Sequence, residues 1–251
     1  MKESNFFIDI AVKQQNCKHE RICGDTFLFR RSDGGNRSII VLSDGMGHGV
    51  KANILSTITA SVIANFDYKQ ESIRKLAATI LHSLPKCSIR KISYSTFTIV
   101  DIDLKRQHAT IIEYDNPRSI LLRGGANLQG AEEATVIVDE GERPQKIKVT
   151  NFRIAEGDRI IVMSDGVTQS GVGTEAYPFG WGWKNVNLFA LETVGNAPAI
   201  SSEELATAVL VRAAGNDHEV TNDDVTCGVI TIRRPKCVLL CSCPPSSDDL
   251  N

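Results

Sequence analysis

The sequence lacks any long apolar run and any excess of basic charge. No stretch of its 251 residues approaches the roughly 20 apolar residues of a membrane-spanning helix, and the opening MKESNFFIDIAVKQQ has no apolar signal-peptide core. The 28 lysines and arginines are outnumbered by 30 aspartates and glutamates, which argues against a nucleic-acid surface, because phosphate backbones require clustered cations. We therefore expect a cytoplasmic globular protein that binds neither membrane nor nucleic acid.

Cysteine pairs with the spacing of a zinc site are also missing. The seven cysteines include no CxxC pair, and scattered thiols in a cytosolic chain are most often buried. Cys237, Cys241 and Cys243 lie in a polar tail over residues 236–251, which we separate from a domain over residues 1–235. No histidine accompanies this cluster, so the pattern favours structural thiols over a metal site.

The sequence contains no complete phosphate-binding glycine loop. The stretch GMGHG lies between a predicted strand and a predicted helix, where such loops occur. However, Gly45, Gly47 and Gly49 do not match G-x-G-x-x-G, and no G-x-x-x-x-G-K-[ST] is present. The carboxylate of Asp44 at the start of the loop would also repel a bare phosphate, so this interpretation is disfavoured.

The first half of the sequence predicts a hairpin followed by two helices. Two apolar runs flank Asp33-Gly34-Gly35-Asn36, which is typical of a tight β-hairpin turn. Apolar residues then recur every three or four positions from about Val50 to Asn65, and again from Ile73 to Leu84 before Pro85. This period predicts two consecutive helices.

The second half is rich in strands. STFTIVDIDL, QHATIIEYD and SILLRGG predict an antiparallel meander, which ATVIVD and QKIKVTNFRI continue. GDRIIVMSDG predicts a strand buried on both faces, SSEELATAVLVRAAG a helix capped by Ser201 or Ser202, and VTCGVITIRR the last strand. Residues 174–198 are rich in Gly and Trp, and we expect them to be irregular. This order predicts an α+β fold with mainly antiparallel sheets, since it does not alternate as βαβ units do.

One short phrase occurs twice in unlike surroundings. SIIVLSDG and RIIVMSDG each end an apolar run in Ser-Asp-Gly, at Asp44 and Asp165. A single Asp-Gly is most often a turn, but further acids also stand at strand ends: Asp25 after Gly24, and Asp223 and Asp224 before the last strand. If these ends converge, the carboxylates repel one another unless bound cations balance them. Mg²⁺ and Mn²⁺ prefer such oxygen ligands, and the glycine after Asp44 would let a backbone carbonyl approach the ion.

Taken together, these segments resemble a known family. CGDTFLF, IIVLSDGMGHGVKAN, STFTIVDID, ATIIEYDNPRSILLRGG, GDRIIVMSDGVTQS and NDDVTCGVITI are similar in content and order to the metal-dependent (type-2C, or PPM) serine/threonine phosphatases, and more specifically to their bacterial SpoIIE/RsbU branch. The resemblance spans about residues 5–234. It implies two mainly antiparallel sheets packed as a sandwich and flanked by helices, a four-layer αββα fold with two Mn²⁺ or Mg²⁺ ions at one end.

The resemblance also implies roles for individual residues. The expected metal ligands are Asp25, a bridging Asp44, the Gly45 carbonyl, Asp165 and Asp223, with Asp224 as a less certain alternative to Asp223. Eukaryotic members of the family carry a histidine two residues after the bridging Asp, but here Met46 occupies that position and His48 follows. His48 is either a general acid for the leaving oxygen or a residue on the rim of the site.

By the same resemblance, the expected reaction is hydrolysis of phosphoserine or phosphothreonine by metal-activated water. The expected partner is a small phosphorylated regulator of the anti-anti-sigma (STAS) type, and a homodimer is possible. Two alternatives remain open: a catalytically inactive PPM-fold binding module, and a metal-dependent hydrolase of a small phosphate ester. Phe179, Trp181 and Trp183 are either core or loop anchors, or contacts to a protein substrate.

Overall fold

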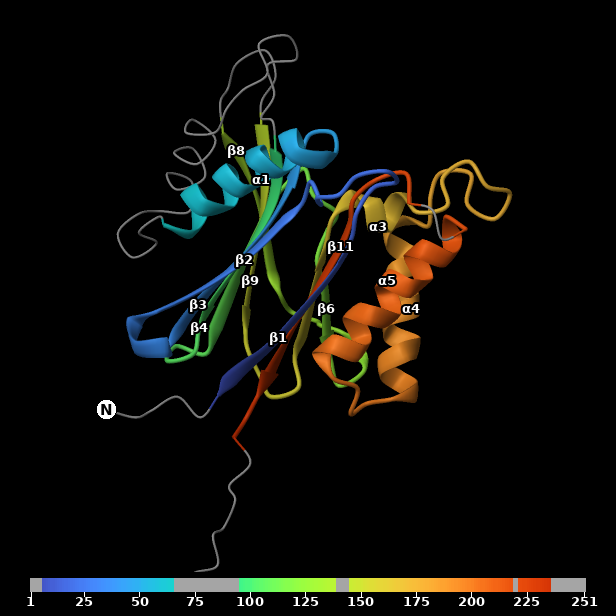
Figure 1. Cartoon of the computed structure of the whole chain (residues 1–251). Coiled ribbons are helices and arrows are strands. Elements are labelled where there is room, and N and C mark those ends of the chain that lie inside the picture. The colour runs from blue at the N-terminus through green and yellow to red at the C-terminus, as the bar shows by residue number, and fades with distance from the viewer. Residues whose placement is uncertain (1–5, 66–94, 139–144, 219–220, 236–251) are drawn as a thin grey trace, which may run out of the picture.

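The structure, a computed structural model, describes residues 6–65, 95–138, 145–218 and 221–235. They form two antiparallel sheets (Figure 1). The first has the order β1 (Phe7–Gln15), β11 (Val225–Arg233), β10 (Arg159–Met163), β6 (Ile120–Arg123) and β7 (Ala126–Asn127). The second has the order β2 (Thr26–Ser32), β3 (Arg37–Gly45), β4 (Ser95–Asp103), β5 (His108–Tyr114), β9 (Gln145–Arg153) and β8 (Glu132–Val138).

Helices cover the outer face of each sheet, which gives the four-layer αββα fold implied by the resemblance. The helix α1 (Gly49–Ala64) packs on the six-stranded sheet, whereas α4 (Gly182–Asn196) and α5 (Ser202–Asn216) pack on the five-stranded sheet (Figure 1). The short helix α3 (Asp165–Gln169) follows β10, and a 3₁₀ turn, η1 (Asp33–Gly35), joins β2 to β3. None of the helices in the described ranges has the length and apolarity needed to span a membrane.

Strand β3 shows how the sequence builds these layers. Ile40 and Leu42 point into the core between the two sheets, whereas Ile39 and Val41 belong to the core beneath α1. Successive side chains of a strand face opposite ways, so a central strand covered on both faces must be apolar throughout. Strand β10 follows the same rule and is buried along its whole length, as its unbroken apolar run predicts.

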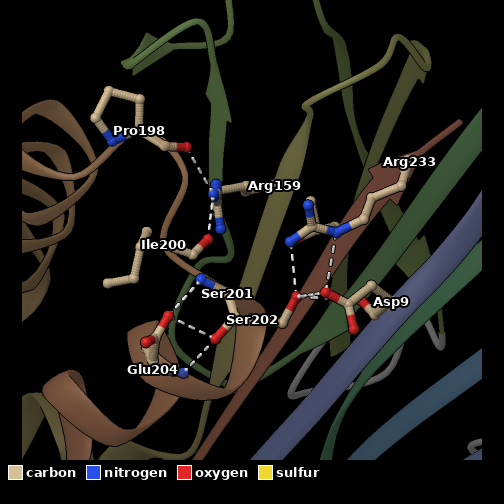
Figure 2. Close-up of polar contacts among 9 residues, drawn as sticks. Asp9, Arg159, Pro198, Ile200, Ser201, Ser202, Glu204 and Arg233 are labelled. Carbon is tan, nitrogen blue, oxygen red and sulfur yellow. Dashed lines mark hydrogen bonds and ion pairs between the residues drawn. The ribbon is translucent and has the colours of Figure 1, made fainter. Parts of the chain in front are cut away.

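Several predicted elements are confirmed. The hairpin around residues 33–36 joins β2 to β3, with Ser32 paired to Arg37, and α1 lies within one residue of its predicted ends. In α5, Ser201 rather than Ser202 is the N-cap: its hydroxyl accepts from the Glu204 amide, and the Glu204 carboxylate accepts from the Ser201 amide (Figure 2). The predicted second helix, from Ile73 to Leu84, and the tail from residue 236 lie outside the described residues.

The predicted meander is wrong in two places: β6 does not belong to it, and β9 rather than β8 lies beside β5. β4, β5, β9 and β8 are consecutive neighbours, but β6 leaves them and pairs with β10 in the other sheet. Ile120 and Leu122 face the helical layer, while Leu121 packs toward the core between the sheets. The loop before β6 contains Pro117, which has no N–H to donate to a strand ladder, and this loop carries the chain across to the second sheet.

The expectation that residues 174–198 are irregular is also wrong. Residues 182–196 form α4, whose Val186, Ala190 and Val194 recur every four residues and are buried against α5 and the five-stranded sheet. Gly182 and Gly195 lie on either side of these apolar residues, and glycine has a low helix propensity. The four-residue period of the buried side chains was therefore not recognised as helical in the sequence. Trp181 is buried in the same core, whereas Phe179 is 94% exposed, so the three aromatic residues form no single patch.

Candidate metal centre

The two Ser-Asp-Gly sequences form two similar corners, each at the end of a buried strand. Ser43 and Ser164 are fully buried, and each hydroxyl donates to a backbone carbonyl of the neighbouring chain segment. Ser43 Oγ lies 3.1 Å from the Thr96 oxygen, and Ser164 Oγ lies 3.4 Å from the Asp224 oxygen. Each serine therefore fixes its strand end, and the aspartate that follows is held at the sandwich edge.

The glycine of each corner is required by close backbone packing. A Cβ atom on Gly45 would lie 2.1 Å from the Ala52 carbonyl oxygen, and one on Gly166 would lie 2.2 Å from the Asp224 carbonyl oxygen. Real Cβ atoms do not approach backbone so closely, so no other residue fits without displacing α1 or the start of β11. The repeated phrase thus meets one local packing need in two places.

A pocket of about 390 Å³ opens between the two corners. Its lining includes four carboxyl-bearing residues, Asp44, Asp115, Asp165 and Asp223, and also His48, Ser95, Thr96 and Tyr114. Three of the predicted ligands therefore converge, although more than 170 residues separate the first from the last. They come from β3, from the start of α3 and from the segment that leads into β11.

The carboxyl groups strongly perturb one another. Burial, together with the nearby Asp25, Asp165 and Asp223, raises the pKa of Asp44 to about 10. Burial and Asp165 likewise raise the pKa of Asp223 to about 6. Without a balancing cation, Asp44 therefore holds a proton at neutral pH.

Asp25 and Asp224 lie behind this pocket rather than in its lining. Asp25 is 4% exposed, and its Oδ2 accepts a 2.6 Å hydrogen bond from the Thr226 hydroxyl. Burial raises its pKa to about 7, and this hydrogen bond opposes the rise. Asp224 Oδ1 accepts from the Cys17 amide at 2.9 Å, while its Oδ2 is buried and has no partner among the described residues. Of the two adjacent acids, Asp223 is thus the one that faces the pocket.

His48 occupies the rim. It is the residue directly before α1, its side chain is 58% exposed, and its Nδ1 lies 2.6 Å from Glu20 Oε1. It also lines the pocket and lies close enough to lower the pKa of Asp223. Both predicted interpretations, proton donor and rim residue, are compatible with this position.

These residues fit hard divalent cations held partly through water. Mutual repulsion among the acids and the unpartnered Asp224 Oδ2 are what a positive ion would relieve. Within the described ranges, no group of three or more His, Cys, Asp or Glu side chains is placed to hold one ion by itself. Mg²⁺ commonly binds through one or two carboxylates and keeps several waters, so this geometry suits a hydrated ion better than an all-protein cage.

Some supporting residues have no strong signal in the sequence. Thr226 links Asp25 to Ser164, because its hydroxyl donates to Asp25 and its amide donates to Ser164 Oγ at 3.0 Å. Gln169 donates to Asp165 Oδ2 at 2.7 Å from one turn further along α3. The i, i+4 spacing of Asp165 and Gln169 is visible in the sequence, whereas the Thr226 link depends on two strands meeting in space.

The match to known proteins covers most of the chain. The sequence profile of the family described as Stage II sporulation protein E (SpoIIE) matches residues 34–233. The chain belongs to the SpoIIE family. The family match contains both Ser-Asp-Gly corners and the segment with Asp223, and Asp25 precedes it.

Individual relatives are more distant. Stage II sporulation protein E of Bacillus subtilis is 23% identical over 213 residues, which cover 84% of this chain and 24% of that protein. Phosphoserine phosphatase RsbX of Bacillus subtilis is 25% identical over 170 residues, 66% of this chain and 77% of RsbX. The chain spans no more than a third of the length of the stage II sporulation E proteins that it matches.

Solved structures of this SpoIIE-family fold agree with the architecture. The phosphatase domain of Bacillus subtilis SpoIIE superimposes with a TM-score of 0.69 at 19% identity, covering 97% of this chain and 99% of that one. RsbX in complex with magnesium gives a TM-score of 0.60 at 20% identity, covering 92% and 98%. These likenesses confirm the two antiparallel sheets with flanking helices.

Proposed function

We propose that this SpoIIE-family chain is a metal-dependent protein phosphatase that hydrolyses phosphoserine or phosphothreonine on a small regulatory protein. The observation that carries the proposal is the convergence of Asp44, Asp165 and Asp223 in one pocket, next to the buried Asp25. The family supports phosphatase chemistry, since RsbX is named a phosphoserine phosphatase and the SpoIIE neighbour is a phosphatase domain.

The proposed ligands are Asp25, Asp44, the Gly45 carbonyl, Asp165 and Asp223, and two Mg²⁺ or Mn²⁺ ions are the proposed cofactors. Such ions, held by these residues, would supply a water of lowered pKa and would balance the charge of the phosphoryl oxygens. Asp44 would be the central ligand, because it is in hydrogen-bonding contact with Asp165 and also within electrostatic reach of Asp25 and Asp223.

The chain's own residues supply positioning and proton control. The pocket acids repel a phosphate group as long as no cation is bound, which makes substrate binding depend on the metal. Ser43 and Ser164 keep both corners in register, so that Asp44 and Asp165 keep their spacing. On the rim, His48 Nδ1 lies 2.6 Å from Glu20 Oε1, which leaves Nε2 as the ring nitrogen available to the leaving serine oxygen.

The substrate proposal depends on the family. A pocket of this size at the protein edge admits a phosphorylated side chain displayed by a folded partner. The proposed partner is a phosphorylated STAS-type (anti-anti-sigma-like) protein, for which support comes from the partner-switching names among the relatives, including a neighbour that contains RsbU and RsbW domains.

Phosphate release measured with and without Mn²⁺ tests the proposal. We expect the wild type to release phosphate from a phosphoserine-containing STAS domain in Mn²⁺, and not in EDTA. Free nucleotides should react at least about tenfold more slowly, a difference of about 1.4 kcal/mol. Asp44→Asn should be inactive, and Glu192→Gln, an exposed acid on α4, should match the wild type. Absence of Mn²⁺-dependent release from the phosphoprotein would contradict the proposal, and faster release from nucleotides would reassign the substrate.

A further inference from the structure

A second hollow lies at the other end of the same strands that carry the metal centre. It has a volume of about 900 Å³ and is lined by Arg159 at the start of β10, by Arg233 at the end of β11, and by Arg234. We call it the arginine groove. Strand β11 begins beside Asp223 and runs nine residues to Arg233, so at about 3.3 Å per residue roughly 25–30 Å separate the groove from the metal centre.

The central feature of the groove is a buried arginine without a matching acid. Arg159 is 5% exposed, and its Nη2 donates to the carbonyl oxygens of Ile200 at 2.6 Å and Pro198 at 3.2 Å (Figure 2). Its Nη1 is buried and has no partner in the described part of the chain. No carboxylate in the described ranges lies within ion-pair distance of Arg159, and its hydrogen bonds there go to neutral carbonyl groups.

The neighbouring charges leave the groove positive. Arg233 pairs with Asp9 through Nε at 3.1 Å (Figure 2), and Arg234 pairs with Glu156 at 3.5 Å. The groove therefore has three guanidinium groups and two carboxylates around it. Burial lowers the pKa of Arg159, Arg233 lowers it further, and Asp9 partly opposes them.

A buried charge with no counter-charge is costly, because the desolvation penalty of an ion amounts to several kcal/mol and repulsion by Arg233 adds to it. An apolar side chain at position 159 would avoid this cost. Arg159 nevertheless stands at the start of a strand that is otherwise apolar, and it borders an open groove. An anion bound there would remove the cost, since guanidinium groups hold phosphate and carboxylate oxygens in pairs.

We propose that the arginine groove is a binding site for an anionic group, a phosphate or a carboxylate, held by Arg233 at the entrance and by the charge of Arg159 beneath it. Gly157 in the lining has a positive φ of 84° and no side chain, so it leaves room for a ligand. Val194 and Ile232 add apolar wall for the carbon part of an organic anion. This inference does not depend on the proposed phosphatase function.

The anion has two possible sources with the same chemistry. One is a free phosphate or small carboxylate. The other is the chain itself, because residues 236–251 follow Pro235, which lines the groove, and include Asp248 and Asp249.

Titration of the full chain with inorganic phosphate in EDTA, followed by calorimetry, tests the site. Without metal, the acids of the other pocket repel phosphate, so binding reports on the groove. We expect Arg233→Gln and Arg159→Lys each to weaken phosphate binding at least about tenfold, the size of one lost charged hydrogen bond. Arg106→Gln removes the same charge from an exposed side chain on the β4–β5 turn, and it should bind within about twofold of the wild type.

Two further arms make the test decisive. In Asp248→Asn/Asp249→Asn, a rise in phosphate affinity of about tenfold would show that the tail supplies the resident anion, and unchanged affinity would show that a free anion does. Arg159→Lys retains the positive charge, so it is less prone to misfold than an apolar variant. If neither the wild type nor the Asp248/Asp249 variant binds phosphate, or if Arg233→Gln and Arg159→Lys bind it as tightly as Arg106→Gln, the proposal is wrong.

Discussion

The two Ser-Asp-Gly corners are built alike but hold their aspartates differently. In both, a buried serine bonds to a neighbouring carbonyl and a glycine packs against backbone where no Cβ fits. After Asp44 the chain passes through Met46-Gly47-His48 before α1 begins, whereas Asp165 is itself the first residue of α3. Asp165 thereby gains a hydrogen bond from Gln169.

Asp44 instead lies among other acids. Its pKa rises to about 10 because it is buried and faces Asp25, Asp165 and Asp223. The different surroundings of Asp44 and Asp165 separate two roles of the Ser-Asp-Gly sequence. The serine and glycine shape the corner, and the electrostatic surroundings of the aspartate decide how strongly it depends on a cation.

The largest expected effect on turnover comes from replacing each of the two corner aspartates by asparagine in a separate variant. Asp44→Asn should lower phosphoprotein turnover at least about a thousandfold, about 4 kcal/mol, because it removes the carboxylate that interacts with Asp25, Asp165 and Asp223. Asp165→Asn should cost about a hundredfold, since that corner keeps Gln169 and its helix. Single-turnover phosphate release in saturating Mn²⁺ measures both, and equal losses would remove the distinction between the corners.

Replacing the corner glycines should break the shared packing. Gly45→Ala and Gly166→Ala should each lower the free energy of unfolding by about 3 kcal/mol or more, because the new methyl group would overlap a carbonyl oxygen. Gly215→Ala in α5, where the new methyl group would meet no other atom within 4 Å, should instead stabilise by about 0.5–1 kcal/mol. Urea unfolding in EDTA compares the three, and a corner variant as stable as Gly215→Ala would refute the packing argument.

The two serines should differ in their contribution to stability. Ser164→Ala leaves the buried Thr226 amide without its acceptor and should cost about 1–3 kcal/mol. Ser43→Ala removes one donor to the Thr96 carbonyl and should cost about 1 kcal/mol. Chemical denaturation of both variants measures the difference, and a larger loss for Ser43→Ala would contradict it.

The last expected effect, small over any single pH unit, is a pH dependence caused by Asp44. Its folded pKa of about 10 lies above the unfolded value, so the metal-free folded state binds the extra proton, and stability falls as pH rises from 7 to 9. The slope should be about 1 kcal/mol per pH unit. Asp44→Asn should lack this slope, and unfolding in EDTA at several pH values compares it with the wild type. Parallel curves for the two proteins would be the contrary result.

Strong local patterns predicted much of this fold. The hairpin at residues 33–36, the length of α1 and the fully buried β10 follow from turn chemistry and periodicity. The strand β6 was predicted, but its sheet could not be, because its partner is decided by the path of the chain after Pro117 rather than by its four residues. The helix α4 was missed because its bracketing glycines outweighed a buried stripe that only packing reveals.

In the candidate site, too, some residues were predicted from local sequence patterns and others only from the structure. The repeated phrase pointed to Asp44 and Asp165, and the structure brings both to one pocket with Asp223. The choice between Asp223 and Asp224 could not be made from the sequence, since only the structure shows that Asp223 lines the pocket while Asp224 is bonded to the Cys17 amide. The burial of Arg159 at the far end of β10, which is what makes this arginine unusual, was equally invisible in the sequence.

Calorimetric titration with Mn²⁺ tests the central claim, that acids from separate strands jointly hold hard cations, most directly. We expect the wild type to take up Mn²⁺ and to release protons as it does so, because the proton that Asp44 holds near neutral pH must leave. Asp44→Asn should lose most of the uptake and the proton release, and Glu192→Gln should retain both. No Mn²⁺ uptake by the wild type, or equal uptake by Asp44→Asn, would contradict the account.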